Sequence, residues 1–302
     1  MTATVGVVGP GAMGLGIVAS LVRAGMRVVA RDIRPEADER ARAAGAKIAS
    51  SPADVARAAP VVIVVVVDAA QVDEVLFGAD GIVASGVPDR IVMVASTLDP
   101  DYVRALPARC MRAGIAILDT PISGGPAKAH DGTMTIMVAG PGEARERVAP
   151  VLEAIAARRF PISDRVGDAA ATKIVNNLLA AANLAAAAEA LALAEALGLD
   201  VRATADVIAA SSGASWIFAD RVPRALAGDY VPRAASRILA KDVGIACDVA
   251  RRAEAHDTFA QAAKRAFDDT VLAGYGEDDD AAIVRRARER MRQRAGGGPS
   301  TS

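Results

Sequence analysis

The sequence is poor in the residues that build metal and redox sites. Only two of its 302 residues are cysteine and only two are histidine. Cys110 and Cys247 lie far apart and fit no zinc or dithiol spacing, and with only His130 and His256 besides, we expect no metal site. Aromatic residues make up 3% of the chain. Alanine, valine and leucine must therefore build the core, and we expect the single tryptophan, Trp216, in that core or at a subunit interface.

The chain also lacks an excess of charge of either sign. Its 35 basic and 36 acidic residues leave a formal charge of −1, which gives no basic field for nucleic acid. The opening residues, MTATVGVVGPGAMG, lack the basic region of a secretion signal, and we expect a cytoplasmic protein. The apolar stretch 174–194 contains three asparagines and a glutamate, whose insertion cost argues against a membrane span.

Lysine is the scarce basic residue. Thirty of the 35 basic residues are arginine, and the five lysines are Lys47, Lys128, Lys173, Lys241 and Lys264. Lys173 falls in an alanine-rich helical pattern, one turn before Asn177. Arginine does not release its proton in a protein, whereas a desolvated lysine can. The choice of lysine at this position therefore indicates proton chemistry.

A dinucleotide-binding motif opens the chain. The stretch TVGVVGPGAMGLGIVASLVRAG predicts a strand, a glycine turn and a helix, and a second strand ends at Asp32, 21 residues after Gly11. In such a motif the glycines allow a tight turn, close approach to a pyrophosphate and close helix packing, while the acid accepts bonds from the NAD ribose. Asp32 favours NAD, and Arg34 leaves NADP open. The predicted cofactor-binding residues here are Gly9, Gly11, Ala12, Met13, Gly14 and Asp32.

The rest of the amino-terminal half alternates between strand and helix patterns. Residues 61–68, VVIVVVVD, predict a strand buried on both faces, AILDTPI another, and 143–156 a helix. This alternation predicts a Rossmann-type α/β fold, a doubly wound and mostly parallel sheet. Ligands of such sheets gather beyond the carboxyl ends of the strands. Ser96, Thr97 and the PISGGP segment fall at such ends and are candidate site residues.

The carboxy-terminal half predicts helices only. Residues 169–197 contain no glycine or proline, and Gly198 follows, which predicts one helix about 40 Å long, enough to join two domains. We therefore expect an NAD-binding domain at 1–165, an all-helical substrate and dimerisation domain at 166–294, and a flexible tail at 295–302. The acidic EDDD before RRARERMRQR suits a helix with acids at its amino end, which we interpret as structure and solvation.

Together these motifs resemble the β-hydroxyacid dehydrogenase family, which includes the 3-hydroxyisobutyrate dehydrogenases. The resemblance covers nearly the whole chain through GPGAMG, DTPISGGPAKAHDGTMTIMVAG, GDAAATKIVNNLL and AKDVGIA, in the family's order. Ala169 stands where that family often has glycine, and Asn176–Asn177 is the pair of the wider family. The segments SWIFADRVPRALAGDYVPRAA and AGYGEDDDAAIV look most like the L-threonate dehydrogenase branch.

The resemblance implies a division of roles. Lys173 would be the general acid/base on the substrate hydroxyl, in a neutral form during oxidation, and Asn177 would orient the substrate. The substrate carboxylate would be held at Ser123, Gly124 and Gly125. The cofactor would also contact Ser96, Thr97 and Lys241, with Asp242 holding that lysine. The family's helical domains imply a homodimer or homotetramer.

Three functional hypotheses follow. The favoured one is an NAD-dependent dehydrogenase of a small hydroxy acid, with L-threonate or a similar sugar acid as substrate. The second is a 3-hydroxyisobutyrate or tartronate-semialdehyde reaction on the same scaffold. The third is a non-catalytic NAD-binding regulator, against which the retained Lys173, Asn177 and Ser-Gly-Gly segment argue. A decarboxylating 6-phosphogluconate dehydrogenase would need a longer helical domain, and imine reductases typically replace the lysine.

Overall fold

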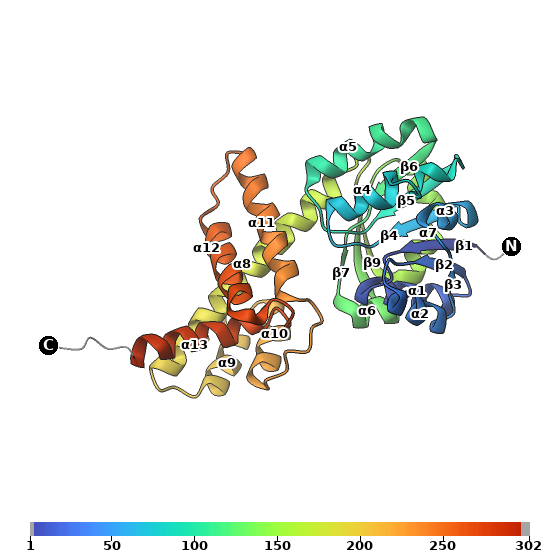
Figure 1. Ribbon diagram of the computed structural model, residues 1–302. Coiled ribbons are helices and arrows are strands. Elements are labelled where there is room, and N and C mark those ends of the chain that lie inside the picture. The colour runs from blue at the N-terminus through green and yellow to red at the C-terminus, as the bar shows by residue number, and fades with distance from the viewer. Residues whose placement is uncertain (1–2, 297–302) are drawn as a thin grey trace. The chain divides into compact units, whose positions relative to one another are not determined.

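The computed structural model describes residues 3–296, and the chain forms two compact units, Met1–Lys173 and Ile174–Ser302. Helix α8 (Asp168–Ala196) runs from the first unit into the second (Figure 1). The boundary predicted after residue 165 falls just before this helix begins, whereas the tertiary contacts divide within it, at Lys173.

The first unit is built on one nine-stranded sheet in the order β3-β2-β1-β4-β5-β6-β8-β7, with β9 also paired to β8 (Figure 1). The strands from β3 to β6 are all parallel, and β8 runs antiparallel to β6 and β7. The predicted Rossmann-type α/β class is thereby confirmed. The strands are β1 (Thr4–Val8), β2 (Arg27–Arg31), β3 (Lys47–Ile48), β4 (Val61–Val64), β5 (Arg90–Val94), β6 (Ile115–Asp119), β7 (Ile122–Ser123), β8 (Met134–Ala139) and β9 (Ala156–Ser163).

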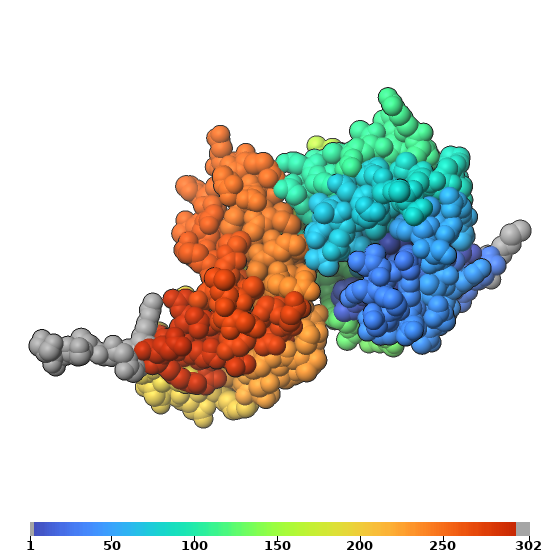
Figure 2. All heavy atoms as spheres, viewed as in Figure 1, coloured from blue at the N-terminus to red at the C-terminus, as the bar shows by residue number. Residues whose placement is uncertain are grey.

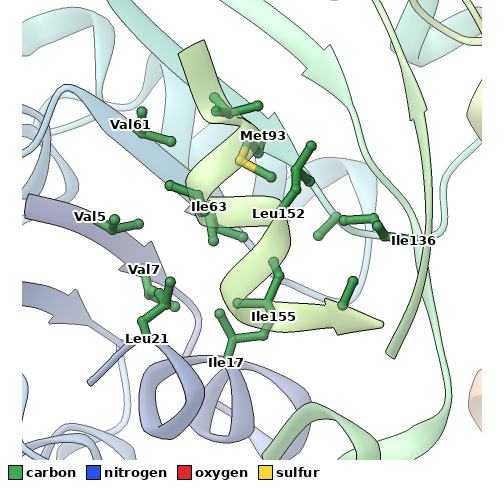
Figure 3. Packing of buried hydrophobic residues seen from close by; sticks show 14 of the residues in the cluster. Val5, Val7, Ile17, Leu21, Val61, Ile63, Met93, Ile136, Leu152 and Ile155 are labelled. Atoms are coloured by element: carbon green, nitrogen blue, oxygen red, sulfur yellow. The ribbon is translucent and has the colours of Figure 1, made fainter. Parts of the chain in front are cut away.

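Helices cover both faces of this sheet, and aliphatic side chains fill the space between. On one face Val5 and Val7 of β1 meet Ile17 and Leu21 of α1, with Ile63 of β4 beside them (Figure 3). All four residues of β4 are buried, as a strand covered on both faces requires. The helices of the unit are α1 (Ala12–Arg23), α2 (Pro35–Ala43), α3 (Pro52–Ala58), α4 (Ala69–Phe77), α5 (Pro100–Cys110), α6 (Gly125–Asp131) and α7 (Gly142–Ile155), with short 3-10 turns at Val83–Ser85 and Met111–Ala113.

The structure corrects three details of the predicted sheet. The apolar run at 61–68 is a strand only to Val64, because residues 65–68 form the loop toward α4. The predicted strand AILDTPI is two strands, interrupted at Thr120–Pro121. Strand β9 was not predicted, since almost all of its residues are exposed and show no alternation. Arginines, a proline and register shifts protect this edge from further pairing.

The second unit is helical throughout, as predicted. After α8 come α9 (Val201–Ala209), α10 (Trp216–Leu226), α11 (Ser236–Arg252), α12 (Thr258–Thr270), the π-helix η3 (Val271–Tyr275) and α13 (Ala282–Gly296). Residues of α11, α12 and α13, orange to red in Figure 2, form much of the face of this unit that is seen there. Gly198 follows α8 in a left-handed conformation at φ 70°. Trp216 is 65% exposed, so it does not lie in the core, and the other predicted location, a subunit interface, stays a prediction.

Two acids of the EDDD segment lie in the interior of the second unit. Asp279 is fully buried and Asp280 is 2% exposed, so the interpretation of this segment as solvated is wrong for both. Arg224 Nη2 donates to Asp279 Oδ1 at 2.8 Å, and Arg221 Nη2 donates to Asp280 Oδ2 at 3.2 Å. Burial raises the pKa of Asp280 to about 6, although Arg221 acts in the opposite direction. The two arginines of α10 therefore hold the turn before α13 by charge.

Removing one partner of this network should destabilise the second unit strongly. We expect Arg221→Met to lower the free energy of unfolding by about 3–5 kcal/mol, because it leaves the Asp280 carboxylate buried without its main cation. Urea denaturation followed by circular dichroism measures this loss. The double variant Arg221→Met/Asp280→Asn is the control and should recover much of the stability. Equal losses in the single and double variants would contradict the charge pairing.

Candidate active site

The glycine loop between β1 and α1 is shaped by backbone contacts that leave no room for side chains. Gly9 has φ 89°, and a Cβ on it would lie 2.4 Å from Val65 O of the loop after β4. A Cβ on Gly14 would lie 2.3 Å from Gly9 O. At Gly11 the nearest atom to such a Cβ is Nη2 at the end of the long Arg34 side chain, at 3.2 Å. Gly9 and Gly14 thus form the loop, while Gly11 leaves its surface open to a ligand.

Asp32 follows β2, and both of its carboxylate oxygens are bonded to Arg34. The Arg34 guanidinium donates to Oδ1 at 3.0 Å and to Oδ2 at 3.1 Å, and the Arg34 backbone N–H donates to Oδ1 at 2.9 Å. Burial alone would raise the pKa of Asp32, but the bonds and charge of Arg34 outweigh it and lower that pKa. Asp32 is therefore an anion at neutral pH, 6% exposed, at the carboxyl end of its strand.

Ser96 joins the loops that follow β4 and β5. Its hydroxyl oxygen accepts a hydrogen bond from the Val66 backbone N–H at 3.0 Å, and the residue is 5% exposed. This bond fixes the chain just beyond the Val65 carbonyl that contacts Gly9. Ser96 therefore helps to fix the loop that packs against Gly9. The next residue, Thr97, is partly exposed. Both stand at the carboxyl end of β5, as predicted.

The Ser-Gly-Gly segment leads from β7 into α6. Ser123 pairs with Thr135 of β8, and Gly124 and Gly125 have φ of 135° and 75°, values that L-residues with side chains rarely adopt. A Cβ placed on Gly125 would meet no atom within 4 Å. The backbone at Gly125 therefore faces open space, which suits the close approach of an anionic group.

Asp119 at the end of β6 holds the first turn of α8. Its Oδ2 accepts from the backbone N–H groups of Gly167 at 3.0 Å and Ala170 at 2.8 Å. Lys173 follows three residues after Ala170 on the same helix face and is 7% exposed. A role for Asp119 was not predicted from the sequence, although Asp119 lies in the predicted strand AILDTPI, just before the PISGGP segment.

In the second unit the buried side chain of Asn177 belongs to a hydrogen-bond network. Its Nδ2 donates to Asp242 Oδ2 at 2.7 Å, and Asn176 Nδ2 donates to Asn177 Oδ1 at 3.1 Å. Lys241 Nζ lies 2.8 Å from Asp242 Oδ1. Asp242 is 3% exposed and therefore links the asparagine of α8 with the lysine of α11, beyond the predicted pairing with Lys241 alone.

The predicted site residues thus fall into two groups. Within the first unit the glycine loop, Asp32, Ser96, Thr97, Ser123 and the following glycines all stand at or beyond the carboxyl ends of strands, and Lys173 is tied to that edge through Asp119. Asn177 and Lys241 belong to the second unit, where Asp242 connects them. The first group provides an open glycine loop beside an anion, which fits a dinucleotide.

The comparisons with known proteins agree with this arrangement. Residues 4–166 match the model of the NAD binding domain of 6-phosphogluconate dehydrogenase, and residues 167–287 match that of the NAD-binding of NADP-dependent 3-hydroxyisobutyrate dehydrogenase. The L-threonate dehydrogenase of Cupriavidus necator is 42% identical over 285 residues, which cover 94% of this chain and 96% of that protein.

Solved structures give the same result. The crystal structure of 3-hydroxyisobutyrate dehydrogenase from Salmonella typhimurium superposes with a TM-score of 0.86 at 38% identity, covering 94% of this chain and 99% of that one. The Mycobacterium tuberculosis 3-hydroxyisobutyrate dehydrogenase with L-serine gives a TM-score of 0.85 at 28% identity, covering 95% and 100%. The chain belongs to the β-hydroxyacid dehydrogenase family and is an NAD(P)-dependent dehydrogenase of hydroxy acids. The predicted resemblance, enzyme class and cofactor type are thereby confirmed.

Helix α8 has the length and hydropathy of a membrane span, but 44% of its most apolar window is buried within the structure. Ala181, Leu184 and Leu191 of this helix lie in the core of the second unit. These contacts are those of a central core helix.

Alanine substitutions at Gly14 and Gly11 should distinguish a glycine that the fold of the loop requires from one that cofactor binding requires. We expect Gly14→Ala to cost about 1–3 kcal/mol in stability, because its Cβ would overlap the Gly9 carbonyl oxygen. Gly11→Ala should stay within about 0.5 kcal/mol of the parent and still weaken NADH binding at least about tenfold, because the pyrophosphate needs this surface. Thermal denaturation and NADH fluorescence titration measure the two effects. Unchanged NADH affinity in Gly11→Ala would contradict the predicted binding mode.

Proposed function

We propose that this protein is a cytoplasmic dehydrogenase that oxidises L-threonate, or a closely similar sugar acid, with NAD. The observation that carries the proposal is the buried Lys173, held three residues beyond the Asp119-capped turn in the unit that also contains the glycine loop. The relative from Cupriavidus necator, 42% identical over nearly the full length of both chains, supports the choice of substrate.

In the proposed mechanism the protein binds two groups of the substrate, its carboxylate and the hydroxyl that is oxidised. The substrate carboxylate lies at Gly124 and Gly125, of which Gly125 faces open space, with the Ser123 hydroxyl as a donor. Lys173 in its neutral form accepts the proton of the substrate hydroxyl, and in the reverse direction its ammonium returns it. Asn177, with its amide fixed by Asp242, orients the hydroxyl. NAD, when bound, would supply the acceptor for the hydride of the hydroxyl-bearing carbon.

The preference for NAD over NADP rests on Asp32. Its lowered pKa keeps a buried anion where the adenosine ribose of a dinucleotide would lie, and an anion repels a 2′-phosphate. Arg34 neutralises part of this charge, and its partly exposed guanidinium can turn away from Asp32. We assign Ser96, Thr97 and Lys241 to the cofactor as well, together with the backbone of Ala12 and Met13 at the start of α1.

We also propose that the protein is a homodimer or homotetramer that uses the exposed face of α8. Val175, Leu179, Leu193 and Leu197 are each between 52% and 67% exposed. The spacings of 4 and 14 residues place the first three along one side of α8, and Leu197 follows directly after the end of the helix. Such an apolar line on a helix favours burial against another subunit.

A panel of small hydroxy acids tests the substrate proposal. We expect L-threonate with NAD to give the highest kcat/KM, at least about tenfold above 3-hydroxyisobutyrate, glycerate, L-serine and tartronate-semialdehyde in its reverse reaction, because pockets built for substrate hydroxyls discriminate strongly. NADH formation or consumption at 340 nm measures each rate, and NADP is run in parallel. Faster turnover of 3-hydroxyisobutyrate would discard the sugar-acid substrate and keep the mechanism.

Replacing Lys173 tests the mechanism itself. We expect Lys173→Met to lower kcat by about 10²–10⁴, the usual contribution of general acid/base catalysis, while the Kd for NADH stays within about twofold. Lys173→Arg is the matched control for charge, and it should be as inactive because arginine does not release its proton. A Lys173→Met variant with full turnover would refute the mechanism. A parent protein that binds NADH and turns over none of the acids would favour a regulatory NAD-binding protein.

A further inference from the structure

Asp119 connects two parts of the candidate site that lie far apart in the sequence. It is the last residue of β6 and is 1% exposed. Four residues later the chain reaches Ser123, whereas the hydrogen-bond donors to the Asp119 carboxylate, Gly167 and Ala170, lie up to 51 residues away. One carboxylate thus joins the strand exit that leads to the Ser-Gly-Gly segment with the start of the helix that carries Lys173.

The bonds of Asp119 fix the first turn of α8 in position and in rotation. The N–H groups of Gly167 and Ala170 converge on one oxygen, Oδ2, at 3.0 and 2.8 Å. The first N–H groups of a helix have no partner within it, and here a buried anion supplies one where the helix dipole also favours negative charge. Because a helix rises 1.5 Å per residue, Lys173 lies only about 4.5 Å along the axis from Ala170. A shift of this turn therefore moves the lysine with it.

Proton transfer requires that the base be placed precisely relative to the substrate hydroxyl. A base works only within hydrogen-bond reach of the proton it takes, and a misplacement of about 1 Å can cost about 100-fold in rate. The neighbouring Asp168, in the first turn of α8, points elsewhere: its carboxylate accepts from Ser163 and Arg165. Asp168 thus joins this turn to Ser163 at the end of β9, whereas Asp119 joins it to the end of β6, from which the chain leads to the Ser-Gly-Gly segment.

We infer that Asp119 is a positioning residue for catalysis, which holds the acid/base Lys173 in register with the substrate-binding segment that begins at Ser123. This inference rests on the proposed role of Lys173. Asp119 takes no proton from the substrate. It acts on the chemical step by keeping the first turn of α8 on the end of β6. A residue that merely stabilised the fold would change stability without acting through the lysine.

Asp119→Asn is the informative variant, because asparagine keeps the shape and one acceptor oxygen but loses the charge. We expect kcat to fall about tenfold, with the Kd for NADH and the KM for the acid within about twofold of the parent. Asp119→Ala, which removes both acceptors, should lose more, and the smaller loss in Asp119→Asn is the rescue by the conservative change. Asp168→Asn is the matched control, and its kcat should stay within about twofold.

The double variant Lys173→Met/Asp119→Asn decides between positioning and stability. If Asp119 acts through Lys173, the double variant should be no slower than Lys173→Met alone, because the lysine is already gone. Additive losses, or an unchanged kcat in a folded Asp119→Asn, would overturn the inference. Full activity in Lys173→Met would instead refute the proposed role of Lys173. A failure of the proposed function can thus be told apart from a failure of the inference about Asp119.

Discussion

The candidate site depends on the attachment of one helix to the end of one strand. Helix α8 is continuous from the first unit into the second, and its first turn needs partners for N–H groups that no helix satisfies internally. The buried carboxylate of Asp119 supplies them. A buried anion is costly unless it is hydrogen-bonded, and the helix start provides both the bonds and a favourable dipole. The end of β6 and the start of α8 therefore stabilise each other, and Lys173 lies on α8 three residues after Ala170.

The glycine loop obeys a second constraint, which is the space between backbone atoms. Gly9 and Gly14 are fixed by the carbonyl oxygens of Val65 and Gly9, within 2.4 Å of where their Cβ atoms would stand. The Val65 loop is fixed in turn by the bond from Val66 N–H to Ser96. A residue predicted to contact the cofactor thus also shapes the loop that would receive it. Ser96 therefore has a structural role in the glycine loop in addition to its proposed contact with the cofactor.

The sequence predicted what depends on local pattern, and missed what depends on distant partners. The glycine loop, the long helix ended by Gly198 and the helical second half follow from spacing and periodicity, and all are found. Strand β9 was missed because its residues are exposed and its pairing partner, β8, lies outside its own pattern. The burial of Asp280 was missed because its cation, Arg221, stands 59 residues earlier. Asp119 was missed as a helix cap because helix caps are sought next to the helix in sequence, and this one is 51 residues away.

The contrast between arginine and lysine now has a structural basis. Asp280 is buried and needs a cation that keeps its charge, and Arg221 supplies it with a planar group that meets both carboxylate oxygens. A lysine there could lose its proton on burial and leave the acid unpaired. The proposed role of Lys173 sets the reverse requirement, since a group that never loses its proton cannot take one from a hydroxyl. Arg221→Lys would therefore weaken the buried ion pair, because the lysine can lose its charge. Lys173→Arg would remove the proposed proton transfer, because the arginine cannot lose its charge. Arg221 and Arg224 thus supply permanent charge to buried acids, whereas the role proposed for Lys173 requires a charge that changes during the reaction.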